Sequence, residues 1–236
     1  MMDKKLKQAL QEIYCAPAPE GKGTFLKRHR RRELGRWELL SVQVGYIRWW
    51  VWAVSMALFG AIFWTTVWAE GMGRWYAAAF TPFLALLVVM ENGRAQVYQM
   101  EELELACRVP RAGVLLARMV GLGLFHLALL AALTPALAVW GSVSTVQAGV
   151  YLLTPYLSTA ALGMELTRRV RGREGLVACG GAAAAVSAAG TLAANLRPEL
   201  YRPGYLSLWG LALAASALAA WMEIMLNLKE RELQWN

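Results

Sequence analysis

The fold is decided by a long stretch without Asp, Glu, Lys or Arg, residues 119–164, which reads MVGLGLFHLALLAALTPALAVWGSVSTVQAGVYLLTPYLSTAALGM. A helix that crosses a bilayer needs about 20 consecutive, mainly apolar residues. The stretch has room for two such helices, and the sequence Gly-Ser-Val-Ser at 141–144 favours a tight turn between them. It therefore predicts two membrane spans, about 113–140 and 146–165, joined by a short hairpin.

Outside this stretch, the chain alternates between other uncharged runs and short charged clusters. Apolar residues make up 58% of the 236 residues even without glycine, and charged residues make up 17%. Soluble domains have about 45–50% apolar and about 25% charged residues, and a soluble domain of this size could not bury so much apolar surface. The sequence therefore predicts an all-α integral membrane protein with six transmembrane helices, of which the remaining four cover about 49–69, 74–91, 175–196 and 203–224.

The basic residues indicate how these spans are oriented. Of the 24 Lys and Arg, all but Arg74, Arg197 and Arg202 lie before span one, in the loops after spans two and four, or in the C-terminal tail. Lys and Arg are retained on the cytoplasmic side of a membrane. Both termini are therefore predicted to be cytoplasmic, in a multi-pass protein of the cell inner (plasma) membrane. The net charge of +8 then reflects topology, and no nucleic-acid partner is expected.

The predicted domains are a basic N-terminal segment (1–47), a six-helix transmembrane domain (48–226) and a cytoplasmic tail (227–236). Within the first, residues 33–47 interleave apolar and polar side chains, which predicts an interfacial amphipathic helix before the first span. A basic run ahead of this helix is expected to bind anionic lipid headgroups at the membrane surface. The alternative is that the run only sets the topology. Its members are Lys27, Arg28, Arg30, Arg31 and Arg32.

The sequence offers little for catalysis or metal binding. It has one Asp and two His, and it has no HExxH motif, no paired His and no Cys/His cluster. The segment Gly-Lys-Gly-Thr at 21–24 lacks the spacing of a phosphate-binding loop. The chain is therefore predicted not to be an enzyme and to hold no metal and no cofactor. Any ATP hydrolysis is assigned to a partner subunit.

Three ionisable residues within the spans or at their ends have candidate roles. His126 in the third span is a possible substrate contact along a transport path, and the alternative is a neutral imidazole hydrogen-bonded to a neighbouring helix. Glu165 and Glu223, at the cytoplasmic ends of spans four and six, are expected to pair with Arg118, Arg168 or Arg169.

Span five differs from the others in composition. Between residues 178 and 194 it consists almost entirely of Ala, Gly, Ser and Cys, with Val and Thr. Small side chains let helix backbones approach closely in a membrane. This composition predicts that span five is buried among its neighbours or lies at a subunit interface.

The cytoplasmic loop after span two carries a group of acidic residues on an otherwise basic face. Residues 97–107 are predicted to form a short helix that ends before Pro110. An acidic helix in this position suits the docking of a partner with complementary charge, and the alternative is a solvated loop helix. The predicted docking residues are Met100, Glu101, Glu102, Leu103, Glu104, Leu105 and Pro110.

The same loop resembles that of the permease subunits of type-2 ABC transporters, the export-type half-transporters. In that family the loop after helix two carries Glu and Leu, then a Pro, then a Lys or Arg at the start of helix three. The matching residues in this chain are Glu102, Glu104, Leu105, Pro110 and Arg118. The interfacial helix before span one and the six-span topology are also similar. The Gly-Thr pair that often precedes the Glu is replaced here by Gln99 and Met100.

The resemblance implies the membrane-spanning permease subunit of an ATP-driven ABC exporter. A separate ABC ATPase (nucleotide-binding) subunit would dock on the loop 97–112. A second permease subunit, in a homodimer or a heterodimer, would complete the transport path. Membrane lipids would surround the two subunits. The sequence does not indicate the substrate. An alternative from a different class is a non-transporting membrane scaffold or sensor that holds a cytoplasmic regulator through its basic N-terminal segment.

Overall fold

The computed structural model describes residues 35–68, 73–98, 111–140, 143–170 and 172–233, together with Gly23. By its internal contacts the chain divides into two units, Met1–Gly35 and Arg36–Asn236. The helices discussed below all belong to the second unit. Across the described residues the regular structure is helical and no strand occurs, which confirms the predicted all-α fold.

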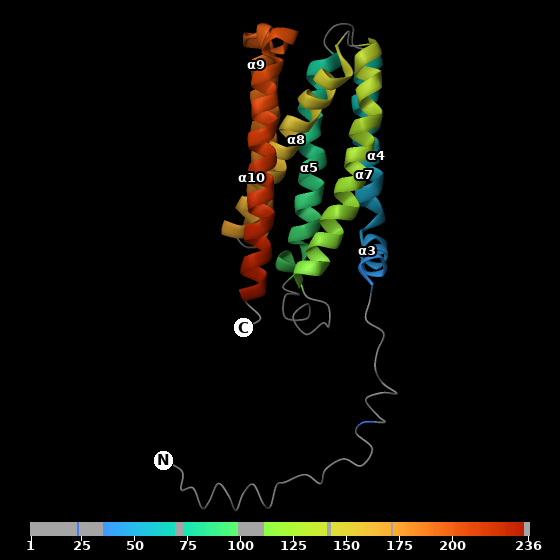
Figure 1. Cartoon of the computed structure of the whole chain (residues 1–236), viewed down its shortest axis with the longest axis vertical. Helices are drawn as coiled ribbons and strands as arrows, with labels where there is room; N and C mark the ends of the chain where they lie inside the picture. Colours follow the sequence, from blue (N-terminus) through green and yellow to red (C-terminus); the bar gives the residue numbers. More distant parts are fainter. Residues whose placement is uncertain are drawn as a thin grey trace, which may run out of the picture. The chain divides into compact units, whose positions relative to one another are not determined.

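Long α-helices that lie side by side dominate the described part of this unit (Figure 1). The turn between α7 and α8 falls within the predicted hairpin, and Ser144 caps α8 by accepting a hydrogen bond from the Gln147 backbone N–H. In chain order the helices are α3 (Arg36–Gly45), α4 (Trp49–Trp68), α5 (Gly73–Val97), α7 (Arg111–Trp140), α8 (Thr145–Arg169), α9 (Arg173–Leu196), the 3-10 helices η1 (Pro198–Tyr201) and η2 (Pro203–Tyr205), and α10 (Leu206–Leu233).

Four of these helices are long and apolar enough to cross a membrane. They correspond to predicted spans one, three, five and six. Helices of this length and composition are those of an integral membrane protein. α8 has 25 residues and is more polar than these four. α5 also has 25 residues. The four are Trp49–Trp68, Gly113–Trp140, Arg173–Leu196 and Pro203–Lys229.

α5 and α8 make the most extensive contacts with other helices. α5 packs against α4, α7, α8 and α9, and α8 packs against α5, α7, α9 and α10. A membrane helix enclosed by other helices can bond its polar side chains to them instead of exposing them to lipid. α8 accordingly buries Gln147, Thr154 and Thr159. The central position of α8 explains why its sequence is less apolar than those around it.

α5 and α8 approach each other closely at Gly163. A Cβ atom at Gly163 would lie 2.8 Å from Val89 Cγ2 and 3.1 Å from Val89 Cγ1, which is well inside van der Waals contact. Val89 belongs to an apolar core that also contains Met164 and Cys179. The missing side chain at position 163 therefore sets the distance between the two central helices.

α5 extends well beyond the predicted end of the second span at residue 91. The prediction ended the span at Glu91 because a carboxylate is costly inside a membrane. In the structure Glu91 is buried, with 5% of its surface exposed, and its carboxylate accepts a hydrogen bond of 3.0 Å from Arg94, one turn later. Glu91 and Arg94 both lie within α5, and the helix continues past this charged pair to Val97.

α9, the predicted fifth span, packs on its neighbours along one side only. Gly175, Cys179, Ala183 and Ala194 are buried, while much of the remaining surface of the helix is exposed. α9 packs on α5 and α8, and α10 packs mainly on α8. α9 and α10 hardly contact one another. The small residues of this span therefore serve close packing along one face and leave the other uncovered.

Candidate functional site

The predicted docking residues, Met100–Leu105 and Pro110, lie outside the described residues, as does the basic run Lys27–Arg32. The structure does describe the helices on either side of residues 99–110, which we call the docking segment. α5 ends at Val97 and α7 begins at Arg111, and both ends lie at the same end of the neighbouring helices (Figure 1). We call this the arginine-rich end, because it holds Arg48, Arg94, Arg118, Arg168 and Arg169.

Contacts from the segment before α4 reach the residue after α5 and the first part of α7. Arg48 Nη2 donates to the Tyr98 hydroxyl at 3.1 Å, and the guanidinium lies 5.3 Å from the centre of the Tyr98 ring. This hydrogen bond lowers the pKa of Tyr98 and raises the pKa of Arg48. On the other side, Arg118 Nε of α7 donates to Gln43 Oε1 of α3 at 3.2 Å. The ends of α5 and α7 are therefore both bonded to the chain around α3.

α3 forms within residues 33–47, where the interfacial helix was predicted, and it packs on α7. Trp37, on this helix, and Tyr46, just after it, are largely exposed, as is Trp49 at the start of α4. Exposed aromatic side chains next to an apolar helix are typical of a membrane border. The helix itself is confirmed, and its position on a membrane surface stays a prediction.

Two ion pairs follow the predicted pairing of acids and bases at the arginine-rich end. Arg168 Nε and Nη2 donate to the two carboxylate oxygens of Glu223, both at 3.1 Å. This pair joins α8 to α10, and both side chains are mostly buried. Arg169 pairs with Glu165 one turn earlier on the same helix and is two-thirds exposed. The first pair therefore links two helices, whereas the second lies on the surface of one.

His126, the candidate substrate-path residue, is fully buried on α7. Its Nε2 lies 2.9 Å from Ser55 Oγ of α4, and its Nδ1 lies 3.4 Å from the Tyr156 hydroxyl of α8. Ser55 donates its own proton to the Val51 carbonyl at 2.8 Å, so its oxygen accepts from Nε2–H. In this neutral tautomer, Nδ1 accepts from the Tyr156 hydroxyl.

This geometry is that of a neutral imidazole bonded to two neighbouring helices. Because Ser55 gives its proton to a backbone carbonyl, Ser55 and His126 are not arranged as a nucleophile and its base. The chain of hydrogen bonds instead ties α4, α7 and α8 together at the middle of their lengths. A role of His126 in a substrate path stays a prediction.

We expect His126→Leu to lower the free energy of unfolding by about 1–3 kcal/mol, because the Tyr156 hydroxyl would remain buried without its partner. Thermal unfolding of the purified protein in detergent measures this loss. The double variant His126→Leu with Tyr156→Phe removes both polar groups and should be less destabilised than the sum of the single variants. Additive losses would contradict the hydrogen bond.

At the opposite end of the helices, polar contacts that the sequence analysis missed hold the turn between α9 and α10. Gln147 Nε2 donates to the Tyr151 hydroxyl at 2.6 Å and to the Tyr201 carbonyl at 3.0 Å. The Tyr151 hydroxyl donates to the same carbonyl at 2.9 Å. The start of α8 is thereby bonded to η1.

Three aromatic rings pack together beside these bonds, and we call them the aromatic cap: Tyr151, Tyr201 and Trp209. Their centroids are 5.0–5.2 Å apart. The Tyr201 hydroxyl donates to the Gly190 carbonyl of α9, and Trp209 Nε1 donates to the Leu200 carbonyl. Burial raises the pKa of Tyr201 to about 12. Tyr201 is turned inward and buried on η1, which begins with Pro as η2 does.

A cavity of about 250 Å³ lies beneath the aromatic cap. A smaller one of about 160 Å³ lies between α7 and α8. His126 lines neither of them. On α5, α8, α9, η1 and α10 the residues around the larger cavity are Ala78, Tyr151, Thr154, Pro155, Ser158, Val186, Ala189, Gly190, Ala193, Tyr201 and Trp209.

Comparison of the chain with protein-family models, with curated proteins and with solved structures found no match. In the described part of the chain, no group of three or more His, Cys, Asp or Glu is placed to hold a metal ion. The functional interpretation therefore depends on the arrangement of the helices and on the residues of the loop after α5.

Proposed function

We propose that this chain is the permease subunit of an ATP-driven ABC exporter, coupled to a separate nucleotide-binding subunit through residues 97–112. The observation that carries the proposal is the position of α5. Its C-terminal end leads directly into that segment, and it packs against α4, α7, α8 and α9. A partner that moved the segment would therefore move the helix on which four others pack.

The residues behind the family resemblance add support. Arg118, the basic residue of the motif, bonds to Gln43 of α3, and α3 precedes the first span as the family's interfacial helix does. The start of α7 is in this way joined to the N-terminal helix. Movement of the docking segment would thus reach α3, α5 and α7 together.

In this proposal all six long helices span the inner (plasma) membrane, and the arginine-rich end faces the cytoplasm together with both termini. A second permease subunit, identical or related, completes the path. Lipid and this second subunit would cover the apolar side chains that α9 and α10 expose, such as Val177, Leu192, Leu211 and Leu218.

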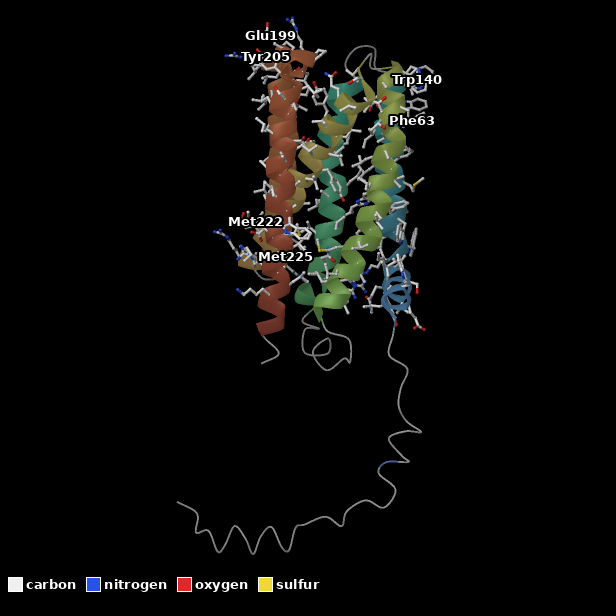
Figure 2. The ribbon with its side chains drawn as sticks, viewed as in Figure 1. Phe63, Trp140, Glu199, Tyr205, Met222 and Met225 are labelled. Atoms are coloured by element: carbon white, nitrogen blue, oxygen red, sulfur yellow. The ribbon has the colours of Figure 1, made fainter. Side chains whose placement is uncertain are left out.

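Charge reversal of the docking acids tests the coupling. The triple variant Glu101→Lys, Glu102→Lys and Glu104→Lys is expected to reduce co-purification of the nucleotide-binding subunit at least ten-fold, because the complementary charge is lost. Glu199→Lys makes the same change on an exposed residue at the opposite end of the helices (Figure 2). This control should leave association unchanged. Retention of the ATPase by the triple variant would contradict the docking role.

Deletion of residues 1–24 separates the permease from the scaffold alternative. These residues belong to the unit Met1–Gly35, which is distinct from the helices, so a permease should keep its nucleotide-binding subunit without them. A scaffold that acts through its basic N-terminal segment should lose its partner. Loss of the ATPase in this variant, with the helices still folded, would argue against the permease.

A further inference from the structure

The cavity beneath the aromatic cap has the properties of a ligand site. The cavity is partly open at its side and measures about 250 Å³. An engineered apolar cavity of about 150 Å³ is large enough to bind benzene. The void is therefore large enough for an organic group rather than for one or two solvent molecules.

The lining excludes a charged ligand and disfavours water. No Asp, Glu, Lys, Arg or His lines this cavity. The Thr154 hydroxyl donates to the Val150 carbonyl, and the Tyr201 hydroxyl donates to the Gly190 carbonyl. A buried water needs two to four polar partners, and these groups already bond to the protein. The remaining lining is apolar, so an apolar occupant is favoured.

Ser158 is the exception among the polar lining residues. Within the described part of the chain, its hydroxyl makes no hydrogen bond. Ser158 is partly exposed, and its hydroxyl faces the space of the cavity. This hydroxyl can donate to one uncharged acceptor, such as an ester or carbonyl oxygen.

The shape of the cavity indicates a chain rather than a compact group. On α8 its lining extends from Tyr151 to Ser158, which at 1.5 Å per residue is about 10 Å along the helix. On α9 the facing residues are small, from Val186 to Ala193. The void is thus an elongated space parallel to the helices, in the direction in which lipid chains also run.

The packing of the helices gives such a chain a way in. The aromatic cap closes the cavity toward the end of the helices. α9 and α10 both pack on α8 but hardly contact one another, so close packing between these two helices does not seal the side of the cavity. A chain could enter here without passing through water.

From these observations we infer that this cavity binds one alkyl chain of an uncharged or ester-linked amphiphile, with an acceptor oxygen near Ser158. Two sources share this chemistry, namely an acyl chain of a bilayer phospholipid and a separate single-chain amphiphile. The inference is independent of the proposed exporter function, because it depends on the described helices and not on the docking segment.

Photo-crosslinking tests the site in the full-length protein in nanodiscs. The two probes are a monoacylglycerol and a diacyl phosphatidylethanolamine, each with a diazirine in the alkyl chain. We expect labelling of the peptides that contain residues 151–158 and 186–193, mapped by mass spectrometry. Labelling by the diacyl probe alone identifies a bilayer lipid, and labelling by the monoacyl probe identifies a separate amphiphile. Both support the site, and labelling of neither peptide by either probe would overturn it.

Matched glycine variants on α9 give the control. A Cβ atom at Gly190 or at Gly181 would meet no atom within 4 Å, so both positions tolerate a side chain. Gly190 lines the cavity and Gly181 does not. Gly190→Leu should reduce labelling at least ten-fold, and Gly181→Leu should leave it unchanged. Ala193→Leu provides a second filling variant if Gly190→Leu does not fold. Equal labelling of a folded filling variant and the control would refute the inference.

Discussion

Replacing Gly163 by Leu is expected to lower the free energy of unfolding by about 3 kcal/mol, at the upper end of the range for overpacked cores. The first atom of the new side chain would already lie 2.8 Å from Val89 Cγ2. Val89 is β-branched and has little rotamer freedom on a helix, so it cannot move aside. α5 and α8 would have to separate. Thermal unfolding of the purified variant should therefore begin at a lower temperature than that of the unchanged protein.

The control for this variant lies on the same helix. A Cβ atom at Gly149 would approach no closer than 3.8 Å, to Thr134 Cγ2, and Gly149 lines the cavity of about 160 Å³. Gly149→Leu should therefore be tolerated. Val89→Ala should partly restore the stability of Gly163→Leu, because it removes the two methyl groups that would clash with the new side chain. If both glycine variants were equally stable, the close approach of α5 and α8 would be disproved.

Arg168→Glu is expected to have the second large effect, a loss of about 2–3 kcal/mol. The change removes both hydrogen bonds from Arg168 to Glu223. It also places two carboxylates together in a largely buried position. Breaking a fully buried ion pair costs about 3–5 kcal/mol, and the partial exposure of this one reduces the cost. Chemical unfolding in mixed micelles measures the difference.

The neighbouring arginine supplies the comparison. Arg169→Glu makes the same change in a pair that is largely exposed and lies within one helix, where about 0–1 kcal/mol is expected. The exchange variant Arg168→Glu with Glu223→Arg restores opposite charges and should recover much of the loss. If the exchange gave no recovery, the pair would not hold α8 against α10.

The sequence was sufficient for the features that depend on local composition. The break between α7 and α8 falls at the predicted Gly-Ser-Val-Ser sequence, because Gly and Ser favour turns whatever surrounds them. The partners of Glu165 and Glu223 were also among those predicted. Four of the six predicted spans are long and apolar enough to cross a membrane. In each case the signal lies within a few residues of the feature.

Features that depend on distant contacts could not be predicted in this way. The inward turn of Tyr201 requires Gln147 and Tyr151 on another helix, and nothing in the sequence near residue 201 indicates that contact. The continuation of α5 past Glu91 likewise depends on burial and on pairing with Arg94. For the docking segment and the basic run, which lie outside the described residues, the evidence remains that of the sequence.

The sparse contact between α9 and α10 has a consequence for movement. The two helices are joined through η1 and η2 at the aromatic cap, while at the other end α10 is held to α8 by the Arg168–Glu223 pair. The 28 residues of α10 correspond to a length of about 42 Å. A rotation of about 5° around the cap would shift its far end by about 4 Å. Because α10 packs on α8 and is paired with it at the arginine-rich end, the two helices would turn together around the cap, and the opposite end would stay almost still.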